Sequence, residues 1–100
     1  MLHEFLIWAE AKARAKGEEY TANHRLELLA MIEGLSQSEG MELMRKELAV
    51  LKSGMELEYR EHGYSIAHGA MWTKMLNVEQ ALQGGAGKLF FKDYDPREKV

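Results

Sequence analysis

The chain contains no cysteine and only one proline among its 100 residues. The lack of cysteine excludes disulfides, thiol catalysis and thiolate-bound metal. A single proline favours a protein built from helices, because proline interrupts them. No charged start followed by a long apolar run is present, so the sequence predicts neither a signal peptide nor a membrane-spanning segment. We therefore expect a cytoplasmic protein.

The chain also lacks a strong excess of charge of either sign. Its formal net charge is −3, and 46% of its residues are apolar. This composition is not that of a disordered chain, and the length fits one domain near the lower limit for an independent core. A slightly acidic balance disfavours direct binding to nucleic acid. The seven methionines indicate an adaptable interior.

The segment from Ser36 to His62 has the clearest helical pattern. Ser36 and Glu39 have the spacing of a capping box, in which each side chain accepts a hydrogen bond from the other's backbone N–H. Apolar residues then recur at steps of three and four, the pattern of a long helix that packs lengthwise: Met41, Met44, Leu48, Leu51 and Met55. A second apolar row recurs every seven residues on roughly the opposite side: Leu43, Val50 and Leu57. A helix with two apolar rows lies either within its own domain or between its domain and another chain.

Two shorter helices are expected before this segment. The first covers about residues 2–16 and ends at Gly17. Ile7 and Trp8 lie outside its main apolar face. They either complete the rim of a small core or anchor a partner protein, because tryptophan is favoured at interfaces. The second helix covers about residues 22–33, with Thr21 as its N-cap and with three inward residues: Leu26, Leu29 and Ile32.

Gly63 and Ser65 predict a break after the third helix, with Gly63 as its C-terminal cap and Ser65 as the next N-cap. The fourth helix, about residues 66–83, would then be an antiparallel neighbour of the third. One uninterrupted helix through Gly63 is the alternative. The inner face of the fourth helix is expected to contain Ala67, Met71, Met75, Val78 and Leu82, widened by Trp72 and Leu76.

The run Gly84-Gly85-Ala86-Gly87 predicts the end of the helical part, so we divide the chain into a helical domain, 1–83, and a hinge with an extended tail, 84–100. The tail carries four large apolar or aromatic residues: Leu89, Phe90, Phe91 and Tyr94. No second strand candidate exists, so the tail must lie on the helices or join another chain. The predicted fold is an all-α, small four-helix domain with an extended C-terminal tail.

Three patterns resemble sites with known chemistry. Gly84–Lys88 resembles a phosphate-binding loop, but Leu82 and Leu89 stand where that motif needs glycine and Ser or Thr. Glu58 and His62, with Glu61 nearby, have metal-ligand spacing on one helix, but no second such pair exists for a helical di-metal centre. His68 is expected to be a neutral packed histidine. The serines fall at caps or on exposed helix surface. We expect no cofactor, no metal and no enzymatic activity.

The second and third predicted helices also resemble a helix-turn-helix, but the reading helix would carry more glutamates than Arg45 and Lys46 balance. The first half of the chain instead contains an acidic set that could meet a basic groove on another protein, or be ordinary solvated surface: Glu10, Glu18, Glu19, Glu33, Glu39 and Glu42.

The surplus of apolar rows is the strongest functional indication, because large exposed apolar patches mark interaction surfaces. We expect a non-enzymatic protein that binds a larger protein, inhibits or modulates it, and forms a homodimer. The expected contacts are Ile7, Trp8, the Leu43/Val50/Leu57 row and the tail. A phage-encoded inhibitor of a host system, such as an anti-CRISPR protein, is one such possibility, although no residue specifies it. The alternatives are a dimeric nucleic-acid-associated regulator and a metal-dependent helical enzyme using Glu58, Glu61 and His62.

Overall fold

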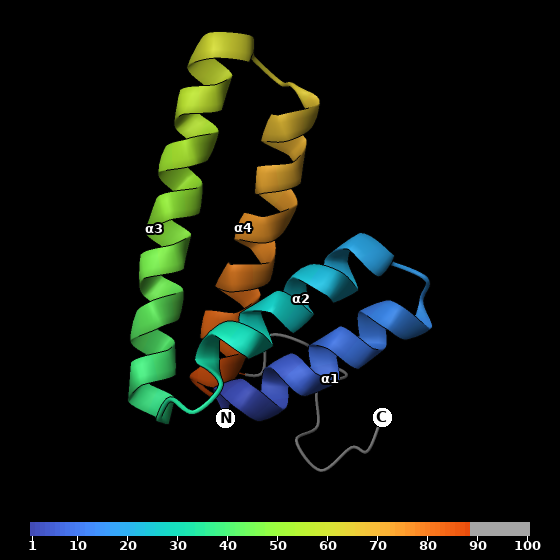
Figure 1. The fold of residues 1–100 in the computed structure, drawn as a ribbon, viewed down its shortest axis with the longest axis vertical. Helices are drawn as coiled ribbons and strands as arrows, with labels where there is room; N and C mark the ends of the chain where they lie inside the picture. The colour runs from blue at the N-terminus through green and yellow to red at the C-terminus, as the bar shows by residue number, and fades with distance from the viewer. Residues whose placement is uncertain (89–100) are drawn as a thin grey trace.

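The computed structural model describes residues 1–88, which form two helical hairpins (Figure 1). The four helices are α1 (Leu2–Ala15), α2 (Glu19–Ile32), α3 (Gln37–His62) and α4 (Ile66–Gly85). The short α1–α2 hairpin lies across the lower part of the longer α3–α4 hairpin. The all-α fold with α3 packed along α4 is therefore confirmed.

The boundaries of α3 and the start of α4 follow the predicted caps. The Ser36 hydroxyl accepts a hydrogen bond from the Glu39 backbone N–H at 3.2 Å, and a Glu39 carboxylate oxygen accepts from the Ser36 N–H at 3.0 Å. Gly63 ends α3 with a φ of +66°, a conformation that glycine adopts without strain. The Ser65 hydroxyl then accepts from the His68 N–H at 3.0 Å. The predicted break at Gly63 is confirmed.

The prediction for α2 was wrong in its start and in its inward face. The helix begins at Glu19 with Glu18 as its N-cap, so Thr21 lies inside the first turn. Leu26 is 51% exposed, whereas Leu28 is fully buried. The reason is that two polar residues, His24 and Arg25, occupy part of the inward face through hydrogen bonds to α1 and α4. An apolar pattern alone does not detect such positions.

Gly84 and Gly85 do not form a hinge, because α4 continues through both of them and buries them. A Cβ atom built on Gly84 would lie 2.2 Å from a ring carbon of Phe5, and one on Gly85 would lie 2.6 Å from the Met41 sulfur. The two glycines therefore allow α1 and α3 to approach the end of α4 closely. The helical part extends two residues beyond the predicted boundary at residue 83.

The core lies where the two hairpins cross. Its largest fully buried side chains come from all four helices: Leu2, Phe5, Leu6, Leu28, Met44 and Val78. Along the chain no residue between Met55 and Met75 is buried, so the far part of the α3–α4 hairpin consists of two helices without a third layer. Ala67, predicted to face inward, is exposed for this reason.

None of the four helices in residues 1–88 carries an apolar stretch of the length that a bilayer crossing demands. The tail residues predicted to contact a partner, Leu89, Phe90, Phe91 and Tyr94, lie outside the described residues.

Candidate protein-binding surfaces

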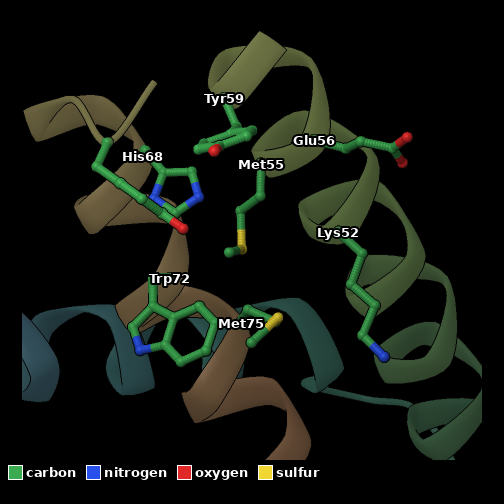
Figure 2. A pocket seen from close by; sticks show the side chains of 8 residues that line it. Lys52, Met55, Glu56, Tyr59, His68, Trp72 and Met75 are labelled. Carbon is green, nitrogen blue, oxygen red and sulfur yellow. The ribbon is translucent and has the colours of Figure 1, made fainter. Parts of the chain in front are cut away.

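The far part of the α3–α4 hairpin contains an open groove between the two helices (Figure 2). Its volume is about 440 Å³. Met55 and Met75 lie in its floor and are 8% exposed, whereas Tyr59 and Trp72 are each 48% exposed. The full lining, called the hairpin groove below, is Lys52, Met55, Glu56, Tyr59, Tyr64, His68, Trp72 and Met75. Exposed Tyr and Trp side chains are enriched at protein–protein interfaces, which makes the groove a candidate protein-binding site.

Helix periodicity places these residues together. Positions three, four and seven apart share one face of a helix, which aligns Lys52, Met55 and Tyr59 on α3 and aligns His68, Trp72 and Met75 on α4. The turn at Gly63 adds one more ring, Tyr64. Its centroid lies 4.8 Å from that of Tyr59, and it meets the His68 ring edge-on at 5.3 Å. Sequence reasoning missed Tyr59 and Tyr64, although aromatic rings flanking the Gly63 turn were the available signal.

The second apolar row of α3 lies on a different side of the helix. Leu57 is two residues after Met55 and therefore about 200° around the helix from it. Val50 is 65% exposed and Leu57 is 52% exposed, while Leu43 is half-buried. This set (Leu43, Val50 and Leu57) is called the outer row below. It was predicted from its seven-residue spacing, and residues 1–88 leave most of it uncovered.

A shallow hollow lies at the start of the outer row. Its volume is about 400 Å³, and it is lined by Leu35, Ser38, Glu39, Glu42, Leu43 and Lys46. Leu35 is 40% exposed. The charged side chains of this lining are Glu39, Glu42 and Lys46, so the acidic charges outnumber the basic one. Glu42 also pairs with Arg45 at 3.1 Å.

Ile7 and Trp8 have different surroundings. Ile7 is 51% exposed, so it remains available to a partner. Trp8 is 7% exposed and packs against Phe5 with ring centroids 5.8 Å apart. Its indole belongs to the core, in agreement with the packing alternative.

The predicted acidic residues do not form one surface. Glu18 and Glu19 lie at the start of α2, and Glu10 pairs with Arg14 at 3.1 Å. Glu33, Glu39 and Glu42 follow the other end of α2, whose 14 residues span roughly 21 Å. Hydrogen bonds from the backbone N–H and hydroxyl of Ser36 lower the pKa of Glu39. Glu39 and Glu42 border the hollow beside Leu43, and Glu18 borders a separate pocket beside Phe5 and Trp8.

A buried polar network joins α1, α2 and α4. The Arg25 guanidinium donates to the Ala9 carbonyl at 2.7 Å, to Asn77 Oδ1 at 3.1 Å and to Gln80 Oε1 at 2.9 Å. Asn77 Nδ2 lies 3.1 Å from His24 Nδ1. Burial lowers the pKa of His24, and nearby Lys74 lowers it further. Burial also lowers the pKa of Arg25. Because these groups satisfy one another's hydrogen bonds, the network holds the three helices together. Arg25 and Gln80 also line a small pocket beside α1.

The residues considered for a metal site, Glu58, Glu61 and His62, lie at the end of α3. Glu58 accepts a hydrogen bond from the Ser65 hydroxyl at 2.7 Å, which ties the end of α3 to the start of α4. His62 Nε2 lies 3.8 Å from Glu61 Oε2 on the exposed surface. Within residues 1–88, no three His, Asp or Glu side chains are grouped to hold a metal ion.

Comparison with protein-family models, with characterised proteins and with solved structures gave no match.

Proposed function

We propose that this chain is a non-enzymatic interaction protein that binds a larger protein through the outer row and modulates it. The observation that carries the proposal is the exposure of Val50 and Leu57, 65% and 52%, on a helix whose opposite side already supplies core residues. Neither side chain contributes to the buried core. Helices commonly bind a partner helix or a groove through such a row of exposed apolar side chains.

The surroundings of the outer row support a partner of particular chemistry. The hollow beside Leu43 can receive an apolar side chain, and Glu39 and Glu42 on its border favour nearby positive charge. We therefore assign to the partner an apolar segment flanked by lysine or arginine. This assignment uses part of the predicted acidic set and no direct contact with nucleic acid.

The rigidity of α3 supports a role in binding. Its 26 residues form one continuous helix that is capped at both ends, so the row is displayed before a partner arrives. A preformed surface avoids the entropy loss of ordering a segment upon binding. By covering an apolar surface on the partner, such a helix can block or modulate whatever that surface otherwise contacts.

Site-specific photo-cross-linking tests the proposal. A photoreactive amino acid at position 57 should capture one defined protein in the native cells, and the same protein should be captured from position 50. Position 7 tests the exposed Ile7 as a competing contact, and position 16, where Lys16 is exposed at the end of α1, is the control. Capture at 7 or 16 with none at 50 and 57 would contradict the assignment of the partner surface to the outer row.

A further inference from the structure

The hairpin groove is a second uncovered surface, and it carries exposed aromatic rings. Tyr64 is 82% exposed, and Tyr59 and Trp72 are each 48% exposed above a floor of two methionines. Methionine floors adapt to the shape of an inserted side chain, and Trp and Tyr are favoured interface anchors. Within residues 1–88 no segment fills the groove.

The charges at the edge of the groove are arranged in a distinctive way. Lys52 and Glu56 lie one turn apart on α3, and both line the groove. Figure 2 shows their side chains pointing away from each other. Lysine placed four residues before glutamate is the weaker orientation for pairing within a helix. Among residues 1–88, Glu56 instead approaches Arg60 at 3.8 Å, and Lys52 makes no ion pair.

The Lys52 and Glu56 charges at the edge of the groove are complementary to the same two charges on a second copy of the chain. In a two-fold symmetric interface, residue i of one copy contacts residue j of the other, and j contacts i. An apolar groove with one base and one acid on neighbouring turns therefore matches a second, antiparallel copy of the same surface. Both charges then find a partner of opposite sign, and the exposed rings of each copy pack on the other's groove.

We propose that the hairpin groove binds the hairpin groove of a second copy of this chain, with Lys52 of each copy against Glu56 of the other. The far parts of the two α3–α4 hairpins then complete one intermolecular four-helix bundle. This would supply a third layer over the part of the hairpin between Met55 and Met75, where no residue is buried. The groove and the outer row lie on different sides of α3, so the inference is independent of the proposed function.

Charge reversal provides a decisive test because the symmetric contact occurs twice. Absolute mass is measured by light scattering over a dilution series for the unmodified chain, for Lys52→Glu and for Glu56→Lys. The unmodified chain should be a dimer at high micromolar concentration. Each single reversal places like charges together at two points, so we expect the dimer dissociation constant to rise at least tenfold.

An equimolar mixture of the two variants is the critical sample. In a mixed dimer every reversed charge faces an opposite charge, so the mixture should regain a dissociation constant within a few-fold of the unmodified chain. Lys16→Glu, which changes the net charge as Lys52→Glu does, should remain dimeric, as should Val50→Glu on the outer row. Helicity by circular dichroism should be the same for all samples.

Three results would overturn the inference. The unmodified chain could be monomeric at every concentration, which would leave the groove to a different protein. The mixture could stay monomeric while each variant is monomeric, which would mean that Lys52 and Glu56 do not face each other. Val50→Glu could abolish the dimer while the groove variants keep it, which would place self-association on the outer row.

Discussion

Asn77 Nδ2 lies 3.1 Å from His24 Nδ1, and a neighbouring hydrogen bond fixes which atom of this pair donates. Arg25 Nε can only donate, and it lies 3.1 Å from Asn77 Oδ1, so the amide oxygen must face Arg25. The amide NH2 group therefore faces His24, whose Nδ1 must accept and carry no proton. The docking of α2 on α4 thus requires a neutral histidine.

This requirement predicts a stability that depends on pH. Burial lowers the pKa of folded His24 below its usual value near 6.5; Lys74 and Arg25 act in the same direction, and Glu27 opposes them. The unfolded chain therefore takes up the proton first, so stability is complete above about pH 6.5 and falls as the pH decreases below it. For one proton the loss reaches about 1.4 kcal/mol per pH unit.

Chemical denaturation between pH 7.5 and pH 5 measures this loss. His24→Gln keeps an acceptor for Asn77 without a titrating ring, so its stability should depend less on pH over this interval. His3→Gln, at an exposed position of α1, should retain the dependence of the unmodified chain. Equal pH dependence for His24→Gln and the unmodified chain would refute the requirement for a neutral His24.

Removal of the Arg25 guanidinium should be costly. Arg25→Met would leave the Ala9 carbonyl and the side-chain oxygens of Asn77 and Gln80 without their present donor. We expect a loss of about 2–4 kcal/mol in the free energy of unfolding, because these acceptors are part-buried and would be left without a hydrogen bond. Arg60→Met is the control: Arg60 is 69% exposed with one weak ion pair, so a change within about 0.5 kcal/mol is expected. Comparable values for the two variants would contradict a structural role for the network.

Two glycines of α4 should respond oppositely to the same substitution. Gly84→Ala would force the Phe5 ring to move and should destabilise the fold by about 1–3 kcal/mol. Gly69→Ala adds a methyl group to an exposed helical position with no atom within 4 Å, and should stabilise by up to about 1 kcal/mol. Thermal unfolding distinguishes the two. A neutral or stabilising Gly84→Ala would show that residue 84 does not pack tightly on α1.

Ser65 caps α4 and also bonds to α3. Ser65→Ala would remove the acceptor for the His68 N–H and the donor to Glu58, at an expected cost of about 1–2 kcal/mol. Ser53→Ala, at an exposed position inside α3, should change stability by only a few tenths of a kcal/mol. A Ser65→Ala protein as stable as the Ser53→Ala protein would argue against the cap as a determinant of the Gly63 turn.

The parts of the fold that the sequence predicted correctly depend on local chemistry. Three local features were predicted correctly: the Ser36/Glu39 capping box, the Gly63 cap and the Ser65 cap. Each involves residues within a few positions of one another, so the sequence spacing alone indicates it. The inward and outward faces of α3 also followed from periodicity, because Met44, Leu51 and Met55 repeat regularly and are buried. The outer row was found for the same reason.

The errors concern contacts between residues far apart in the chain. Phe5 and Gly84 are almost eighty positions apart, so nothing near Gly84 showed that it would be buried in a helix and not open a hinge. His24 and Arg25 can lie on the inward face of α2 because they form hydrogen bonds with Asn77 and Gln80 of α4. Tyr59 and Tyr64 were missed because they line a groove only where the α1–α2 hairpin leaves the α3–α4 hairpin uncovered.

The central claim is that the outer row binds a partner protein while contributing little to the fold. The most direct measurement is the affinity of the cross-linked partner, once purified, for the unmodified chain and for the Val50→Glu/Leu57→Glu variant by titration calorimetry. We predict at least a hundredfold weaker binding by the variant, with its unfolding temperature within a few degrees of the unmodified chain. Unchanged affinity would contradict the claim, and so would a large loss of stability, which would assign Val50 and Leu57 to the fold.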